Sequence, residues 1–338
     1  MSVHGAATVA GGAPWFAGDE PSAVAGGRRL TAAAARAAGF PDQRVNEIQI
    51  VVSELASNLV KHAGGGDLVV RTVPGNGTPG LQVVTIDSGP GCRDIEALVQ
   101  DGVSTRGTLG VGLGAARRLA TRLELHSVPA RGTIVDAVFL SGPAETFPVS
   151  SLVRPLAGQS VSGDATAHRA VAGGLLVMVA DGLGHGPLAA LASTRATEVL
   201  ATSTSTSPSE LIRLMHAALA GTRGAAITIA LLDRGSGTLT HAGVGNVAGR
   251  LVGPGRSRSL PVQPGIVGHK LPRVRELQQA VDSTQTLVLH SDGLTEKWNL
   301  DQLPDVLGKG PTVLAAAVLR EAAIHRDDAG ILALTMSP

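Results

Sequence analysis

The chain has 338 residues, a length that predicts two domains of ordinary size. Its 28 lysines and arginines nearly balance its 27 acidic residues and form no basic run, which excludes nucleic acid as a partner. A single cysteine, Cys92, excludes an internal disulfide, and no apolar run approaches the roughly 20 residues that span a bilayer. The N-terminus lacks a signal pattern, so we expect a cytoplasmic protein without a membrane partner.

The first predicted elements are two helices. Residues 22–38 are rich in alanine and arginine and favour a helix. A second helix carries an apolar stripe at helical spacing, formed by Ile48, Val51, Val52, Leu55 and Leu59. Glu54 and Asn58 are four residues apart and share another face of that helix. An asparagine oxygen can bind Mg²⁺, and a carboxylate one turn earlier can orient or deprotonate a hydroxyl. The alternative is a solvated polar face without chemistry.

A predicted β-hairpin follows, with strands at 68–73 and 81–86. Its second strand runs directly into Asp87-Ser88-Gly89-Pro90-Gly91. An ionised aspartate accepts hydrogen bonds, so Asp87 can receive an exocyclic amino group such as that of adenine. Glycines at 89 and 91 allow the backbone to approach a ligand closely. The alternative interpretation is a simple turn.

A glycine-rich run precedes the next predicted helix, over residues 107–114. Glycines before a helix expose backbone N–H groups that can bind phosphate, and the helix dipole adds to this attraction. Predicted strands at 123–128 and 133–140 close the first half of the chain. Residues 141–151 contain two prolines and no periodicity, so we place a linker there, between domains at 1–140 and 152–338.

In this order, the motifs of the first half resemble the Bergerat-type ATP-binding fold, and most closely the bacterial serine kinases that control sigma factors. The resemblance rests on residues 54–63 and 110–119 and implies a mixed sheet covered by helices. It implies that Glu54 is the catalytic carboxylate, that Asn58 holds the Mg²⁺ of ATP and that Asp87 contacts adenine. The other ATP-binding residues that it implies are His62, Gly89, Gly91, Gly110, Gly112, Leu113, Gly114 and Thr133.

The second half places four acidic sites at the edges of predicted strands. These sites are Asp164, Asp181, Asp292 and the pair Asp327 and Asp328. Unpaired carboxylates repel one another, so if they converge in the fold, a cation must lie between them. Oxygen ligands without cysteine or paired histidine indicate Mg²⁺ or Mn²⁺. The alternative is that aspartate and glycine merely form turns.

Residues 150–338 resemble the PP2C-type phosphatases of the bacterial sporulation and stress-response branch. The resemblance rests on residues 163–164, 181–186, 291–296 and 327–328. It implies an α-β-β-α sandwich with two Mn²⁺ or Mg²⁺ ions held by Asp181, the Gly182 carbonyl, Asp292 and Asp327, with Asp164 and Asp328 in or next to the ligand set. A departure from the family pattern is Gly330, which stands where a threonine is usual, and another is Asn246, which follows Gly245 without the usual histidine.

These interpretations combine into a two-domain α+β protein with an ATP-dependent serine kinase and a phosphoserine phosphatase. The resemblances imply a bacterial partner-switching pathway, with STAS-domain antagonist proteins as substrates and a sigma factor or similar regulator downstream. In one alternative, only the phosphatase is active and the first domain senses nucleotide. In another, the first domain binds a sigma factor or antagonist without phosphorylating it. The sequence leaves oligomerisation and the choice between Mn²⁺ and Mg²⁺ open.

Overall fold

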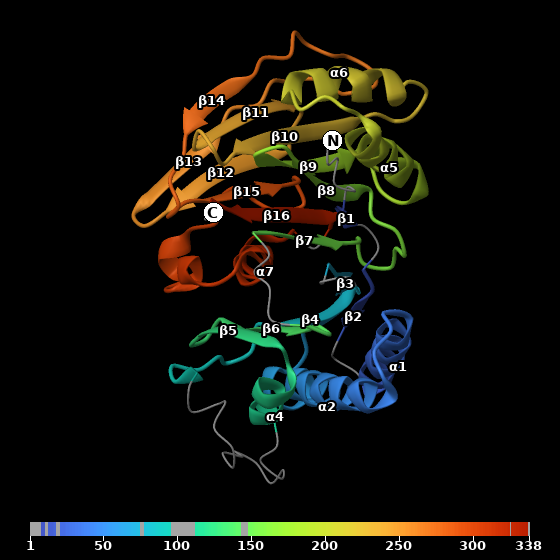
Figure 1. Cartoon of the computed structure of the whole chain (residues 1–338), viewed down its shortest axis with the longest axis vertical. Coiled ribbons are helices and arrows are strands. Elements are labelled where there is room, and N and C mark those ends of the chain that lie inside the picture. Colours follow the sequence, from blue (N-terminus) through green and yellow to red (C-terminus); the bar gives the residue numbers. More distant parts are fainter. Residues whose placement is uncertain are drawn as a thin grey trace. The chain divides into compact units, whose positions relative to one another are not determined.

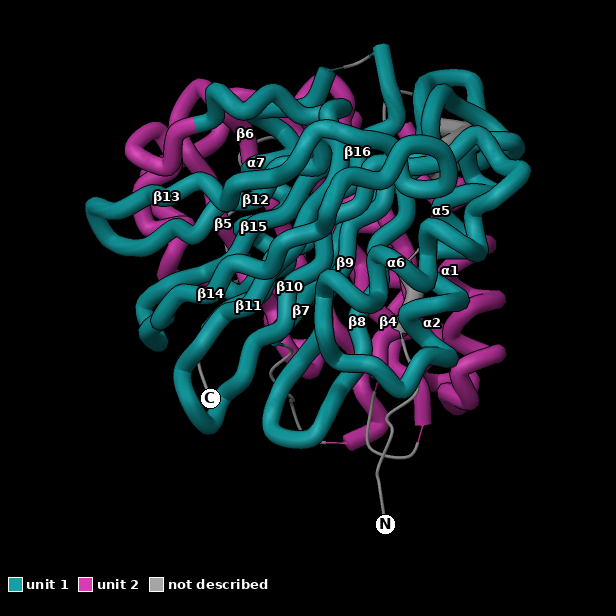
Figure 2. Tube along the Cα trace, turned by 90° about the horizontal axis from the view of Figure 1, so that it is seen from above, with its two compact units in different colours: residues 1–12, 147–298, 310–338 teal, residues 13–146, 299–309 magenta. Residues whose placement is uncertain are grey.

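The chain divides into two compact units in a computed structural model (Figure 2). Unit 1 comprises residues 1–12, 147–298 and 310–338, and unit 2 comprises residues 13–146 and 299–309. The structure describes residues 8–10, 13–17, 21–74, 78–95, 112–142, 148–324 and 326–336. Within these ranges, no helix is long and apolar enough to cross a membrane.

Unit 2 contains a five-stranded sheet with helices packed on one face (Figure 1). In spatial order, its strands are β2 (Trp15–Ala17), β3 (Asp67–Val73), β4 (Gly80–Ile86), β6 (Gly132–Phe139) and β5 (Arg122–Val128). The helices on this face are α1 (Pro21–Ala37), α2 (Asp42–Asn58) and α4 (Gly112–Leu119). The fold class expected for the first half, a sheet covered by helices, is therefore confirmed.

The core of unit 2 lies between these helices and the sheet. The predicted stripe of α2 faces this core, because Ile48, Val51 and Val52 are fully buried. Side chains of β3, β4 and β6 such as Leu68, Val83 and Phe139 meet them from the sheet. Apolar residues at helical spacing and at every second strand position therefore pack face to face.

Unit 1 is built from two antiparallel sheets. The six-stranded sheet has the order β1 (Thr8–Ala10), β8 (Asp164–Val171), β9 (Gly174–Gly182), β10 (Ala225–Asp233), β11 (Thr238–Val244) and β14 (Leu277–Ala280). The five-stranded sheet has the order β13 (Arg256–Leu260), β12 (Ala248–Gly253), β15 (Thr286–His290), β16 (Ala329–Thr335) and β7 (Val149–Arg154). Helices α5 (Pro187–Thr202) and α6 (Pro208–Ala218) pack on the first sheet, and α7 (Pro311–Ala322) packs on the second. This arrangement is the expected α-β-β-α sandwich.

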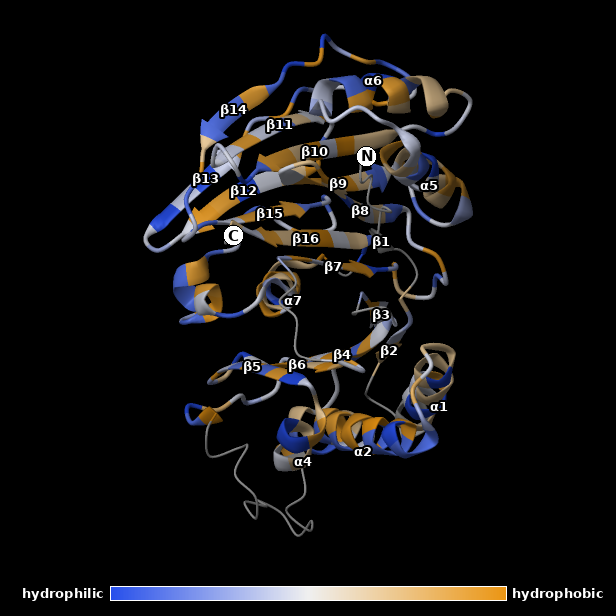
Figure 3. Ribbon diagram, in the orientation of Figure 1, coloured by the Kyte–Doolittle hydropathy of each residue, from blue (hydrophilic) through white to orange (hydrophobic). Residues whose placement is uncertain are grey.

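Strand β9 shows why these layers form. Its alternate residues Leu176, Met178 and Ala180 join the core beneath α5 and α6. Leu175, Val177 and Val179 point the opposite way, into the core between the two sheets. Because both faces of β9 are buried, its sequence is continuously apolar rather than alternating. Figure 3 shows the same hydrophobic character in β9, β10 and β16.

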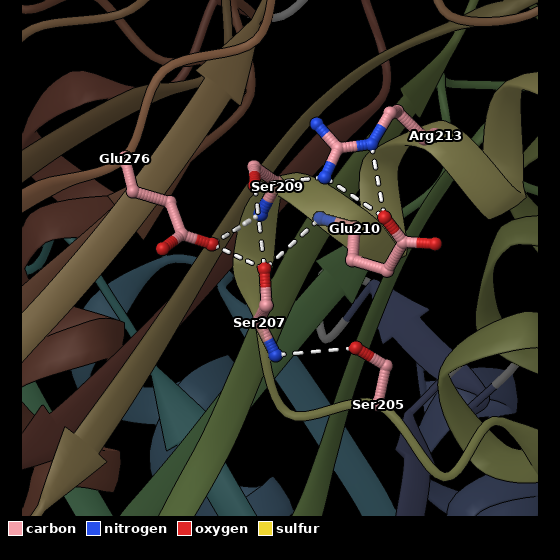
Figure 4. Close-up of polar contacts among 6 residues, drawn as sticks. All are labelled: Ser205, Ser207, Ser209, Glu210, Arg213 and Glu276. Atoms are coloured by element: carbon pink, nitrogen blue, oxygen red, sulfur yellow. Dashed lines mark hydrogen bonds and ion pairs between the residues drawn. The ribbon is translucent and has the colours of Figure 1, made fainter.

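Helix α6 begins with a capped first turn (Figure 4). The Ser207 hydroxyl accepts a hydrogen bond from the Glu210 N–H at 3.1 Å, which is the geometry of an N-cap. The Glu276 carboxylate accepts hydrogen bonds from the same hydroxyl and, at 2.8 Å, from the Ser209 N–H. Glu276 therefore ties the segment before β14 to the start of α6.

Three expectations about the fold need correction. The sheet of unit 2 pairs antiparallel throughout its described strands, where a mixed sheet was expected. Strand β7 begins at Val149, inside the expected linker 141–151, because it pairs with β16 at the edge of the second sheet. The two units also differ from the expected domains 1–140 and 152–338 at two segments. Strand β1 pairs with β8 in unit 1, and residues 299–309 belong to unit 2.

Candidate active sites

The C-terminal end of α2 carries the first group of candidate residues. Glu54 and Asn58 are both half-buried on α2, and His62 is exposed on the turn η1 (Leu59–Ala63). This turn is a π-helix directly after Asn58, and Gly64 ends it in the left-handed conformation with a φ of 73°. A π turn widens the backbone spacing locally and is frequent at functional sites. It was not foreseen, because no sequence signal distinguishes it from a regular helical turn.

The loop after β4 lies against this helix end. A β-carbon at Gly89 would approach the Ala63 Cα to 2.7 Å, and one at Gly66 would lie 3.1 Å from the Asp87 Cβ. The structure therefore places the turn that follows Asn58, and the glycines after it, next to the Asp87 motif. These glycines are required by close backbone packing, in addition to any contact with a ligand.

Hydrogen bonds hold the carboxylate of Asp87 in place. Its Oδ1 atom accepts the backbone N–H of Gly89 at 2.9 Å and that of Thr133 at 3.0 Å. Thr133 also exchanges a 2.9 Å hydrogen bond with the Ser127 hydroxyl on β5. Two backbone donors stabilise the ionised form of the carboxylate and set its direction. Thr133 thus positions Asp87 through its main chain.

Two glycines allow this loop to close. Gly91 and Gly132 both have positive φ, at 58° and 98°. A β-carbon at Gly91 would overlap the carbonyl oxygen of Val128, and one at Gly132 would overlap that of Asp87. Glycine is the residue that accepts both the backbone conformation and the close approach.

The glycine-rich run is described only from its second half. Gly110 lies outside the described residues, whereas Gly112 begins α4 and Gly114 is buried within it. Leu113 is half-buried and packs against the core of unit 2. Gly112 and Gly114 are therefore placed at a helix start, as the phosphate-binding hypothesis requires.

The acidic residues of unit 1 converge from three distant segments. Asp164 opens β8 and lies directly opposite Asp181 of β9 in the antiparallel register. Asp292 follows β15, and Asp327 precedes β16, the neighbour of β15. Asp181 and Asp292 share a hydrogen bond, and Asp164 and Asp327 are close enough to affect the pKa of Asp181. Strand pairing thus gathers the carboxylates that the sequence predicted.

The pKa values of three aspartates in this cluster are raised. Burial, together with the charges of Asp164, Asp292 and Asp327, raises the pKa of Asp181 to about 9. Burial also raises the pKa of Asp164 to about 7, against the hydrogen bond that it accepts from Ser291. The pKa of Asp292 is raised by burial and by the charge of Asp327. These shifts favour the protonated form of the carboxyl groups, and a bound cation would reverse that preference.

Asp328 differs from its neighbour in its contacts. Its Oδ1 accepts the Leu156 N–H and its Oδ2 accepts the Gly163 N–H, both at 2.7 Å. Both oxygens thus bind backbone donors of the segment that leads into Asp164. This geometry favours a role in positioning Asp164 over direct binding of a metal ion.

Two polar residues at the cluster were missing from the predicted set. The Ser291 hydroxyl donates to Asp164 Oδ2 at 2.6 Å and accepts the Gly330 N–H at 3.0 Å. Asn246 donates from Nδ2 to Asp292 Oδ2 at 2.6 Å. Each stands beside a recognised motif, so the position in the motif was the available signal. Their hydrogen bonds to the carboxylates became visible only in the fold.

The donor set fits a hard divalent cation. It consists of carboxylates and a backbone carbonyl at Gly182, which are the ligand types of Mg²⁺ and Mn²⁺. Within the described residues, no three of the His, Cys, Asp and Glu side chains form a ready set of metal ligands. Asp181 and Asp292 are joined by a side-chain hydrogen bond, so their carboxyl groups lie close enough to bind one cation together.

The two halves of the chain match different families of known proteins. Residues 18–139 match the histidine kinase-like ATPase domain family. Over 115 residues, the chain is 36% identical to the serine/threonine-protein kinase RsbT of Bacillus subtilis (strain 168), an alignment that covers 34% of this chain and 86% of RsbT. The chain belongs to the histidine kinase-like ATPase family.

The remainder of the chain matches a second family. Residues 172–336 match stage II sporulation protein E, SpoIIE. A solved structure from the bacterial stressosome, described as "a modular system that has been adapted to control secondary messenger signaling", is 27% identical, with a TM-score of 0.50, and the match covers 55% of this chain and 97% of that one. A structure of RsbX in complex with magnesium is 22% identical, with a TM-score of 0.45 and coverage of 55% and 94%. Unit 1 is thus a SpoIIE/PP2C-type phosphatase domain, and unit 2 is an RsbT-like kinase domain.

The phosphatase domain also explains one departure from its family pattern. A β-carbon at position 330 would lie 3.1 Å from Asp164 Oδ2, which is a tight contact. Gly330 therefore leaves room for the carboxylate of Asp164 where the family usually has threonine. The other departure, Asn246, keeps a polar contact with Asp292.

Proposed function

We propose that this chain is a bifunctional regulator of a bacterial partner-switching pathway, with an ATP-dependent protein-serine kinase and a metal-dependent phosphoserine phosphatase. Its substrates are STAS-domain antagonist proteins. The observation that carries the proposal is the convergence of Asp164, Asp181, Asp292 and Asp327. The pKa values of the first three are raised, which supports a site that needs a cation. The sequence identity with RsbT supports the kinase half.

In the kinase domain, the proposal gives each residue a separate task. Asn58 holds the Mg²⁺ that accompanies ATP, and Glu54 accepts the proton of the attacking serine hydroxyl. Asp87, oriented by Gly89 and Thr133, accepts a hydrogen bond from the adenine amino group. The backbone N–H groups around Gly112 and Gly114 face the phosphates.

In the phosphatase domain, Asp181, the Gly182 carbonyl, Asp292 and Asp327 hold two Mn²⁺ or Mg²⁺ ions. When bound, these ions activate water and neutralise charge on the phosphoryl oxygens. Asn246 and Ser291 hold the carboxylates of Asp292 and Asp164 through the hydrogen bonds described above. Asp328 keeps the segment around Gly163 in place.

The two reactions oppose each other. If both acted at once on one serine, their sum would be hydrolysis of ATP alone. We therefore propose that the two domains act on different partners or at different times. Equal, simultaneous action of both domains on the same serine of one regulator would contradict this.

The test is to incubate the protein with labelled ATP, Mg²⁺ or Mn²⁺ and candidate STAS-domain regulators, and to map the modified serine by mass spectrometry. Asp181→Ala should accumulate the phosphoserine, and Glu54→Ala should abolish its formation. A regulator phosphorylated beforehand should lose its phosphate with the parent protein and keep it with Asp181→Ala. If the parent and Glu54→Ala both fail to transfer phosphate, the first domain is a nucleotide sensor. If a partner is captured without ATP and equally by Asn58→Ala, that domain is a binding module.

A further inference from the structure

Arg223 lies beside the loop that carries the first metal ligands of the phosphatase domain. Its Nη1 atom is 2.8 Å from the position of a β-carbon at Gly184, in the loop that follows Asp181 and Gly182. Gly184 is itself exposed and has a φ of 86°. The absence of a side chain at Gly184 thus leaves the space in which the guanidinium lies.

Strand register fixes this position. Ala225 and Ala226 of β10 pair with Gly182 and Asp181 of β9, so Arg223 stands just before the strand that borders the metal ligands. The Leu183 N–H donates to the Gly224 carbonyl at 3.0 Å, which joins the two loops beyond the paired strands. The backbone therefore holds Arg223 next to the loop that follows Asp181 and Gly182.

The guanidinium is exposed and unpaired. Among the residues that the structure describes, Arg223 takes part in no hydrogen bond or ion pair. Its five N–H donors are therefore available to a ligand.

We infer that Arg223 binds the phosphate of the phosphoserine substrate, with the metal-ligating carboxylates on the other side of that phosphate. A planar guanidinium matches two phosphoryl oxygens with two parallel hydrogen bonds, which an ammonium group cannot do. The inference rests on the proposed phosphatase function and adds a residue that selects a dianionic phosphate. It concerns substrate binding, since the cations and water carry out the attack.

The experiment compares the parent protein with Arg223→Ala, Arg223→Lys and the control Arg234→Ala. Arg234 is an exposed arginine at the opposite end of β10, about 30 Å along the strand. We expect Arg223→Ala to raise KM for a phosphoserine peptide on the order of tenfold or more, with a smaller effect on kcat. Arg223→Lys should recover part of this loss, and Arg234→Ala should match the parent.

Two readouts besides turnover separate the outcomes. Inorganic phosphate, titrated calorimetrically into the Mg²⁺-loaded protein, should bind more weakly to Arg223→Ala by a similar factor, while calorimetric Mn²⁺ binding stays unchanged. If the parent protein neither binds the cations nor releases phosphate, the proposed function fails. If the parent is active and phosphate binds equally to Arg223→Ala and the parent, the role of Arg223 is refuted. A loss of Mn²⁺ binding in Arg223→Ala would also refute the role in phosphate binding, because Arg223 would then support the loop that follows Asp181 and Gly182.

Discussion

At the scale of single residues, burial and mutual repulsion raise the pKa values of Asp164, Asp181 and Asp292 in the phosphatase domain. Asp164 is buried, with an exposed fraction of 4%, and accepts a hydrogen bond from Ser291. That hydrogen bond favours the ionised form, but burial outweighs it and raises the pKa to about 7. A buried carboxylate in this state stabilises a fold only when a cation or a proton compensates its charge.

The perturbed pKa values predict how the metal-free protein responds to pH. In the unfolded chain, an aspartate titrates near pH 4. Because folding raises the pKa of Asp164 to about 7 and that of Asp181 to about 9, the metal-free fold keeps protons that the unfolded chain releases. Its free energy of unfolding should therefore fall as the pH rises from about 4 to about 9. Mg²⁺ replaces these protons, so it should raise the unfolding temperature more at about pH 8 than at about pH 5.

This prediction is measured by calorimetric unfolding with EDTA and with Mg²⁺ at both pH values. Asp164→Asn removes one of the titrating groups and should flatten the pH dependence. Glu198→Gln changes an exposed carboxylate of α5 and should leave it intact. A pH dependence in Asp164→Asn as steep as that of the parent would contradict the argument.

At the scale of elements, the turns between strands decide whether the sites form. The loop around Asp87 is held by the turn between β5 and β6. Gly132 in that turn packs directly against the Asp87 backbone, and the Thr133 N–H donates to the Asp87 carboxylate. The first turn of α6 is held by its own cap and by Glu276 (Figure 4). In both places, the contacts of one or two residues hold a longer segment of backbone in its position.

Gly132→Ala should disrupt the Asp87 loop. An alanine there must adopt a φ of 98°, and its β-carbon would overlap the Asp87 carbonyl oxygen. We expect a loss of about 2 kcal/mol or more in the free energy of unfolding, together with weaker binding of Mg²⁺-ATP. Denaturant unfolding and calorimetric titration measure the two effects. The control Gly142→Ala introduces a methyl group with no heavy atom within 4 Å and should change neither. Unaltered nucleotide binding in Gly132→Ala would separate this turn from the site.

Ser207→Ala should destabilise the phosphatase domain by about 1 kcal/mol, the usual effect of removing an N-cap. The substitution leaves the Glu210 N–H and the Glu276 carboxylate each without one partner. Thermal unfolding of the parent, Ser207→Ala and the neighbouring exposed control Thr206→Ala measures the effect. Equal unfolding temperatures in the two variants would show that the cap contributes nothing.

At the scale of the whole molecule, the two units do not follow a single cut in the sequence. Residues 299–309, between Asp292 and α7 in the chain, belong to the kinase-like unit. There, His126 Nε2 lies 2.9 Å from the Pro304 carbonyl oxygen, and Arg131 donates to Gln302 Oε1 at 3.0 Å. A segment of the phosphatase half thus packs on β5 and the turn that follows it.

This exchange predicts that the kinase-like unit is less stable when it is produced without residues 299–309. Replacing these residues in the full chain by a Gly/Ser linker of equal length should lower the unfolding temperature of that unit, because the contacts of His126 and Arg131 are lost. Differential scanning calorimetry measures it, with Mg²⁺-ATP present to identify the transition of the kinase-like unit. An unchanged transition would mean that the segment adds no stability there.

Much of the fold could be predicted from local sequence patterns. The stripe on α2, the apolar run of β9 and the cap at Ser207 each depend on residues close together in the chain. Strands β13 and β14 were missed, and β7 was assigned to a linker, because each lies at the edge of its sheet, where strands lack a clear alternating pattern. Their existence depends on partners far away in the sequence.

The same division holds for the sites. From residue type and spacing, the sequence by itself identified the candidate residues. These are the aspartates of the second half and Glu54, Asn58 and Asp87 of the first half. Only the tertiary structure decided their relations: Asp328 binds backbone donors, Asn246 and Ser291 hold other side chains, and Arg223 lies beside the metal loop. The physical reason is that side-chain chemistry is local, whereas burial, repulsion between charges and hydrogen-bond partners arise from strand pairing across long separations in the chain.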